Sequence, residues 1–209
     1  MISNLFNMNI YQFLLASGRQ SPLIAVQGDI FSTPADHIAF AVHWPNDAGF
    51  SDNDNGGFSS KVVNHGWQEL AYQIFEKGEV RSKVIKGKTF HAMAVHTPQD
   101  GGWEESPLLI EQCLNKIPVS SDEVIACVLI GGGHAGHKYK AGVDNIEGMM
   151  RSYKRVVLHV YDAEMYDKLI ALGIAAQPIP LNIPLSNLPK PLLFRDKQAY
   201  EQYMLESAG

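Results

Sequence analysis

The sequence predicts a three-layer α/β/α domain of the α/β class, with a mixed, mostly parallel central sheet. Short apolar runs typical of buried strands alternate along the chain with segments of helical periodicity. Strands separated by helices favour a mostly parallel sheet with helices on both faces. The chain has 209 residues, of which 45% are hydrophobic and 19% charged, which suits one globular domain with a sizeable core.

Five segments carry the pattern of buried strands. Each is a short run of β-branched and other apolar residues. The strongest is Val124 to Ile130, which is apolar throughout. Lys88 to His96 has apolar residues in both phases of the strand repeat, which indicates burial on both faces. The other three are Leu23–Val26, Ile38–Val42 and Val156–Val160.

Four helices are predicted between these strands and directly after the last of them. The longest runs from Ser59 to Lys77 and ends at Gly78, with Val63, Trp67, Leu70 and Ile74 on its apolar face. The second begins at Ser106-Pro107, an N-cap followed by proline at the first helical position. Its core-facing residues are Leu109, Cys113 and Ile117. The last two begin at the caps Asp144, with Glu147 completing a capping box, and Asp162.

The predicted domain organisation is a single unit followed by a tail. Residues 1–177 form the α/β domain. Residues 178–209 form a proline-rich segment and a C-terminal helix, from about Asp196 to Leu205, packed on the domain. From Gln177 to Pro191 we expect no regular element, because prolines interrupt both helices and sheets.

Charge and cysteine usage narrow the functional class. The formal net charge is −5 and the basic residues are scattered, so nucleic-acid and membrane-surface partners are disfavoured. The stretch Met1 to Ser17 lacks a basic region and a long apolar core, so no signal peptide is predicted. Cys113 and Cys127 stand among apolar neighbours, which indicates two buried free thiols and a reducing, cytoplasmic location.

A glycine loop directly follows the strongest strand. Gly131-Gly132-Gly133-His134-Ala135-Gly136 matches G-x-G-x-x-G, in which backbone N–H groups approach phosphate oxygens unobstructed by a Cβ. A purely structural turn is the simpler alternative. A Rossmann-type oxidoreductase is another, with Asp162 as the ribose-binding acid. Against it, the next helix cap is delayed to Asp144, and the motif comes late in the chain.

A second glycine pair, Gly56-Gly57, precedes the helix predicted to begin near Ser59. Free N–H groups and the positive end of the helix dipole make such a helix start an anion site. Two loops of this kind can hold a diphosphate from opposite sides.

Over approximately Leu23 to Gly173 the sequence resembles the macrodomain family, an ADP-ribose-binding α/β/α module. Gly28-Asp29-Ile30 resembles the family's G-D-I, and Ala41 to Asn46 lies where the family has I-V-N-A-A-N. Gly56-Gly57-Phe58 resembles the first phosphate loop, and Gly131 to Gly136 resembles the second. His43, Trp44-Pro45 and Ala135 depart from the pattern.

The resemblance implies a role for each matching residue. Asp29 would accept from the adenine amino group, with Ile30 packed nearby and Tyr161 stacked on the ring. Asn46 would face the distal ribose, and the two glycine loops would wrap the diphosphate. The local alternatives are a turn or cap at Asp29, a turn at Asn46 and strand-end packing at Tyr161.

The resemblance leaves two activities open. In the enzymatic version, Asn46 or His43 positions a water that hydrolyses an ADP-ribosyl bond. In the other, the chain is a non-catalytic reader of ADP-ribose or of ADP-ribosylated macromolecules, or an interaction module. Neither version requires a cofactor.

No metal site is predicted. Asp52 to Gly57 imitates the start of a calcium loop, but its twelfth position is Val63 instead of Glu. The histidines His43, His91, His96, His134 and His137 lack carboxylate or cysteine partners at ligand spacing.

Overall fold

The computed structural model describes residues 10–14, 20–27, 29–33, 35–44, 57–99, 102–104, 107–120, 123–130, 145–146, 148–160 and 176–179. The strands are β1 (Ile10–Leu14), β2 (Gln20–Gln27), β3 (His37–His43), β4 (Val80–Ile85), β5 (Lys88–Gln99), β6 (Gly102–Glu104), β7 (Val124–Val128), β8 (Arg155–Val160) and β9 (Ala176–Ile179). The helices are α1 (Gly57–His65) and α2 (Pro107–Lys116), with 3-10 helices η2 (Ile30–Ser32) and η3 (Gln68–Ala71). Residues 145–146 and 148–151 are also helical.

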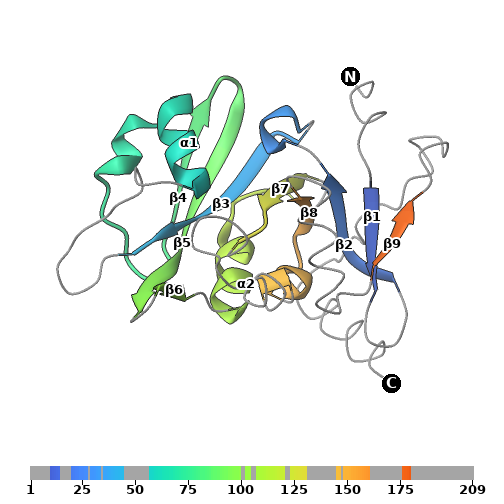
Figure 1. Cartoon of the computed structure of the whole chain (residues 1–209). Coiled ribbons are helices and arrows are strands. Elements are labelled where there is room, and N and C mark those ends of the chain that lie inside the picture. Colours follow the sequence, from blue (N-terminus) through green and yellow to red (C-terminus); the bar gives the residue numbers. More distant parts are fainter. Residues whose placement is uncertain are drawn as a thin grey trace.

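The strands form one mixed sheet in the order β4-β5-β3-β7-β8-β2-β1-β9, with β6 paired to β5. From β5 through β3, β7 and β8 to β2, every neighbouring pair is parallel. The flanking strands β4, β6, β1 and β9 are antiparallel to their neighbours. Figure 1 shows β4 and β5 at one end of the sheet and β1 and β9 at the other. The predicted mixed, mostly parallel sheet is confirmed.

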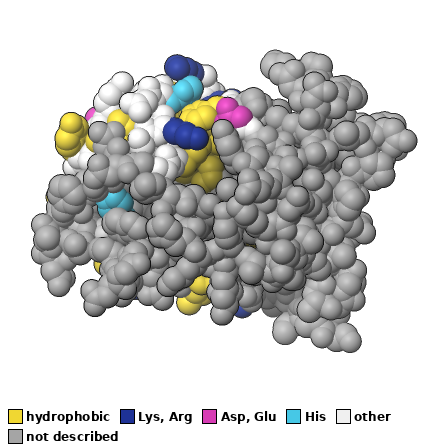
Figure 2. Space-filling model, viewed as in Figure 1, with side chains coloured by type: hydrophobic (Ala, Val, Ile, Leu, Met, Phe, Trp, Pro, Cys, Tyr) yellow, Lys and Arg dark blue, Asp and Glu magenta, His cyan; other side chains and the backbone are white. Residues whose placement is uncertain are grey.

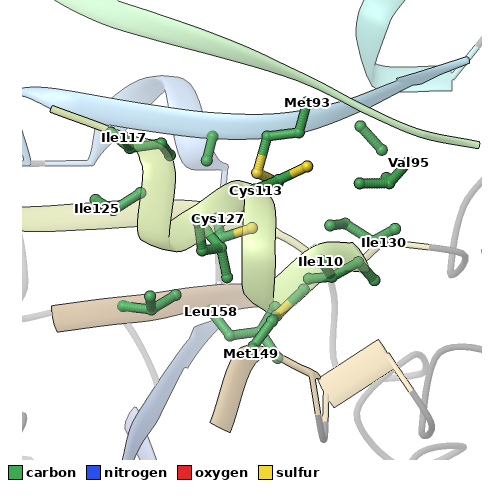
Figure 3. Packing of buried hydrophobic residues seen from close by; sticks show 14 of the residues in the cluster. Met93, Val95, Ile110, Cys113, Ile117, Ile125, Cys127, Ile130, Met149 and Leu158 are labelled. Atoms are coloured by element: carbon green, nitrogen blue, oxygen red, sulfur yellow. The ribbon is translucent and has the colours of Figure 1, made fainter. Parts of the chain in front are cut away.

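Hydrophobic cores lie on both faces of the sheet, which makes three layers. In β3, Ile38, Phe40 and Val42 belong to a cluster with residues of α1 and η3. The alternate residues Ala39 and Ala41 belong to a second cluster with α2 and the helical residues Ile146 and Met149. Figure 3 shows this second cluster, in which side chains of α2 lie between those of β5 and β7. Each fully buried large apolar side chain contributes about 2 kcal/mol.

Burial of β5 on both faces, predicted from its two-phase pattern, is also confirmed. Phe90, Ala92 and Ala94 lie in the core with α1, and Met93 and Val95 lie in the core with α2. The other four predicted strands correspond to β2, β3, β7 and β8.

The long helix predicted from Ser59 to Lys77 is wrong. α1 ends at His65, because Gly66 has φ +146°, which is outside the helical region. Glycine is required there, since a Cβ would lie 2.9 Å from Ile85 Cγ2. Trp67 and Leu70 are buried as predicted, but Trp67 is the N-cap of η3 and Leu70 lies within η3. Ile74 is 54% exposed. Hydrophobic periodicity continued past a glycine whose backbone conformation stops the helix.

The prediction of no regular element from Gln177 onward is wrong at its first residues. Ala176–Ile179 form β9, which pairs antiparallel with β1. Pro178 is tolerated because β9 is the outermost strand of the described sheet, where a missing backbone N–H breaks no further ladder. Residues 180–209, including the predicted C-terminal helix, lie outside the described residues.

The predicted state of the two cysteines is confirmed. Cys113 and Cys127 are free and buried. Burial raises the pKa of the Cys113 thiol to about 11 and that of Cys127 to about 12. Both therefore stay protonated and unreactive at neutral pH. None of the helices in the described part of the chain has the length and apolarity needed to cross a bilayer.

Candidate functional site at the carboxyl ends of the parallel strands

The topology brings the strand ends that precede the predicted site segments to one edge of the sheet. Because β2, β8, β7, β3 and β5 are parallel, their carboxyl ends share that edge. Asp29 stands two residues after β2, His43 ends β3, the glycine loop begins three residues after β7, and Tyr161 directly follows β8. The strand ends that these segments follow are far apart in sequence, and the sheet brings those strand ends to one edge.

A crevice is expected between β3 and β7, which are direct neighbours. After β3 the chain leads to α1, whose Val62 and Val63 pack on one face of the sheet. After β7 it leads to the helical segment of Ile146 and Met149, which packs on the other face. Where connections from adjacent parallel strands leave to opposite faces, the space between them is where α/β proteins bind ligands.

Asp29 is exposed and acts as the N-cap of η2. Its Oδ1 accepts a hydrogen bond from the backbone N–H of Phe31 at 3.1 Å. The Phe31 ring lies 4.6 Å from that of His65. Burial, followed by Lys86, lowers the pKa of His65, and the charge of Asp29 opposes this lowering. Figure 2 shows acidic, basic and histidine side chains beside a hydrophobic patch on the described surface. Asp29 thus serves as a cap, the local alternative foreseen for it.

Ile30 and His43, two further predicted site residues, are buried. The side chain of Ile30 is 4% exposed and belongs to the core with α1. His43 is 7% exposed at the end of β3, where a register shift in β5 sets it opposite His96. Both side chains therefore offer little surface to a ligand or a water molecule.

Gly57 is the first residue of α1 and has φ +69°, a conformation that favours glycine. Phe58, which follows, fixes this end of the helix to the sheet. Its ring lies 5.1 Å from that of Phe31, stacked, and 5.6 Å from that of Phe40, edge-on. These contacts hold the first turn of α1, with its backbone N–H groups, in place beside the carboxyl end of β3.

Trp44 and Lys77 meet at the same edge. Trp44 directly follows β3, and its indole Nε1 is buried without a hydrogen-bond partner among the described residues. The Lys77 ammonium lies 5.6 Å from the centroid of the indole ring. Sequence reasoning missed this pair, since the two residues are far apart along the chain and carry no motif.

The two ends of the glycine-loop segment are fixed to each other. The buried side chain of Asn145 donates from Nδ2 to the carbonyl oxygen of Ile130 at 3.1 Å. Ile130 precedes the segment 131–144 and Asn145 follows it, so the two described residues that flank this segment are held together. Gly56, Gly131, Gly132, Gly133, His134, Ala135, Gly136, Asn46 and Tyr161 themselves lie outside the described residues.

We expect Asn145→Ala to destabilise the protein by about 2 kcal/mol, because it leaves the buried Ile130 carbonyl without its partner. Urea unfolding measures this change. The exposed Asn64, on α1, provides the control: Asn64→Ala should cost little. Equal stability of the two variants would show that the Asn145 hydrogen bond does not hold the segment.

No group of three or more histidine, cysteine, aspartate or glutamate residues in the described ranges is arranged to hold a metal ion. The calcium-like segment from Asp52 lies outside those ranges.

No protein-family model matches the sequence, and neither does any curated protein. Among solved structures, a Trypanosoma brucei macrodomain in complex with ADP-ribose has a TM-score of 0.48 and 12% identity, covering 72% of this chain and 69% of that one. An Oceanobacillus iheyensis macrodomain with MES bound has a TM-score of 0.42 and 13% identity, covering 71% and 88%.

A structure described as alphavirus P23pro-zbd has a TM-score of 0.45 and 13% identity; the match covers 68% of this chain and spans 22% of that one. Macrodomain structures are thus among those that the chain resembles, as its motifs predicted. Similarity at this level by itself assigns neither a family nor a ligand.

Proposed function

We propose that the chain binds ADP-ribose or a related nucleotide diphosphate in the crevice between the carboxyl ends of β3 and β7. The observation that carries the proposal is the divergence of the two connections from these neighbouring strands to opposite faces of the sheet. The sequences of both connections contain glycines, Gly56-Gly57 after β3 and Gly131 to Gly136 after β7.

Charge at this edge favours an anionic ligand. The first turn of α1 supplies backbone N–H groups and the positive end of a helix dipole beside Gly57. Lys77 adds a cation next to the end of β3. The chain as a whole carries a formal net charge of −5, so attraction of a diphosphate must come from such local groups.

If the bound ligand carries an ADP-ribosyl bond, Asn46 is the residue that would position the water for its hydrolysis. His43 was the other candidate for positioning water, but its side chain is almost fully buried at the end of β3. Without hydrolysis, the same site would read ADP-ribose on a modified macromolecule.

Calorimetric titration of the full chain with ADP-ribose, ADP and NAD tests binding. We expect ADP-ribose to bind and Lys77→Ala to weaken it about tenfold, the loss typical of one charge-assisted contact. Lys83→Ala is the matched control, because the Lys83 ammonium is already held by Glu69 at 2.6 Å. If none of the three ligands gives a heat of binding, the proposal is wrong. Binding of NAD alone would favour the oxidoreductase.

Catalysis is tested separately, with an ADP-ribosylated protein as substrate. If the chain is a hydrolase, wild type releases ADP-ribose and Asn46→Ala releases it more slowly while still binding it. If wild type binds ADP-ribose but releases none, the chain is a reader.

A further inference from the structure

A chain of side-chain hydrogen bonds crosses the sheet at the edge opposite the crevice. Ser82 Oγ lies 2.7 Å from His91 Nδ1, His91 Nε2 lies 3.0 Å from His37 Nδ1, and His37 Nε2 lies 3.2 Å from Glu123 Oε1. His37 begins β3 and Glu123 immediately precedes β7, so these hydrogen bonds lie at the amino ends of the parallel strands. The four side chains play no part in the proposed ligand site.

The chemistry of the last member sets the direction of the protons. The Glu123 carboxylate can only accept, so His37 Nε2 carries a hydrogen and donates it. In neutral His37 the other nitrogen, Nδ1, then accepts from His91 Nε2–H. His91 Nδ1 is left as an acceptor, and Ser82 O–H donates to it. Every bond is satisfied with both imidazoles neutral, and the serine hydroxyl faces a base.

Glu123 is well placed to anchor the chain. Its second oxygen, Oε2, accepts from the backbone N–H of Ser120 at 2.6 Å and from the Ser120 hydroxyl at 2.7 Å. These bonds, followed by the one to His37, hold the pKa of Glu123 at about 2. The carboxylate therefore stays charged and can stabilise a proton on His37. Lys154, whose ammonium donates to the carbonyl oxygen of Val119 at 3.1 Å, also interacts with Glu123: burial lowers the pKa of Lys154, and the charge of Glu123 opposes this lowering.

Ser82 is exposed and stands at one end of this row of hydrogen-bonded side chains. It lies on β4, which in the described part of the sheet is an edge strand. Along an antiparallel pair of strands, hydrogen-bonded and non-hydrogen-bonded residue pairs alternate. The backbone N–H of Thr89 on β5 donates to the carbonyl oxygen of Asp36 and so points away from β4, which makes Val84–Thr89 a non-hydrogen-bonded pair. Ser82 pairs with His91, two residues beyond Thr89 along β5, so Ser82–His91 is also a non-hydrogen-bonded pair. The backbone N–H of Ser82 therefore points outward from the edge of the sheet, beside its own hydroxyl.

We propose that Ser82 is the nucleophile of an acyl-transfer site that takes the acyl group of small esters, with His91 as general base and His37–Glu123 as the proton relay. A nucleophile, a base within hydrogen-bond reach and a group that orients the base form the arrangement that activates a serine. The outward N–H of Ser82 is a donor for the developing oxyanion. Val84, on the same side of β4 and 67% exposed, offers apolar surface to the acyl chain.

The proposed step balances within the relay. Ser82 Oγ forms a bond to the ester carbonyl carbon while its proton moves to His91 Nδ1. His91 passes its Nε2 proton to His37 Nδ1, so the positive charge rests on His37 beside Glu123 instead of on His91, which is 1% exposed. When the ester C–O bond breaks, the relay reverses and His91 Nδ1 returns the proton to the leaving alkoxide.

A fluorophosphonate probe tests the nucleophile directly, because Ser82 Oγ would displace fluoride from its phosphorus. Peptide mass spectrometry of the labelled full chain should locate the modification at Ser82. The matched control is the double variant Ser82→Ala, Val84→Ser, which moves the serine two residues along the same face of the same strand. We expect its labelling to be about a hundredfold slower, the effect typical of a general base.

Glu123→Gln tests the relay without replacing either histidine. We expect it to slow labelling of Ser82 about tenfold, while far-UV circular dichroism stays unchanged. In wild type, labelling should also fall in acid, because protonation puts hydrogens on both facing nitrogens of His37 and His91. No labelling at Ser82, or labelling of the serine at position 84 at the same rate, would overturn the proposal.

Discussion

Gly148→Ala is expected to destabilise the protein by about 3 kcal/mol, although alanine is the better helix former by about 1 kcal/mol. A Cβ at this position would lie 2.3 Å from the backbone oxygen of Pro107 and 2.9 Å from its Cα and carbonyl carbon. These are backbone atoms of the first turn of α2, so no side-chain rotation relieves the contact. The helical residues after the glycine loop and α2 would have to separate.

Thermal unfolding measures this effect, with an expected fall of about 10 °C in Tm for a chain of this size. The control is Gln112→Ala, an exposed position on the same α2 helix. It should leave Tm within about 2 °C of wild type. A Tm for Gly148→Ala at or above that of wild type would contradict the close packing of the two helical segments.

Acid should destabilise the protein through His91 before it protonates most carboxylates. Burial, followed by the neighbouring His37, lowers the pKa of His91 from 6.5 to about 4. The unfolded chain therefore binds the proton more readily than the folded chain. The stabilisation is complete above about pH 6.5 and is lost as the pH falls toward about 4, by a total of about 3 kcal/mol.

Urea unfolding at several pH values between 7 and 4.5 checks this slope. His91→Gln should flatten it, whereas His65→Gln, at a half-buried histidine on α1, should leave most of it. Glu123 contributes only in a lower window, since its pKa of about 2 matters below the ordinary value of 4.5. A wild-type free energy of unfolding that stays constant from pH 7 to 4.5 would contradict the burial of a neutral His91.

The parallel core was predictable because its signal is local. β3, β5 and β7 are buried on both faces, and their largely apolar runs record that burial directly. β4 was missed because it is an edge strand, and three consecutive polar residues, Arg81, Ser82 and Lys83, interrupt its apolar residues. The break at Gly66 was missed because the apolar periodicity continues past the glycine, and the side chain that leaves no room for a Cβ there is the distant Ile85.

The candidate site divides in the same way. The glycine loops and Asp29 are short local patterns, so sequence could propose them. The Trp44–Lys77 contact, the Asn145 hydrogen bond and the Ser82–His91–His37–Glu123 chain join residues from different elements. Such contacts arise from strand order and register, which local patterns do not encode. His91 drew attention only as one of several histidines, and its burial and partners gave it a role.

Hydrogen exchange of the full chain with and without saturating ADP-ribose tests most directly whether a nucleotide diphosphate binds between β3 and β7. Backbone N–H groups that contact phosphate oxygens exchange more slowly, and peptides report the protection by position. We predict slower exchange in the peptides that cover residues 44–58 and 129–146, which follow the two strands. Unchanged exchange in both, or protection confined to peptides elsewhere in the chain, would contradict the site.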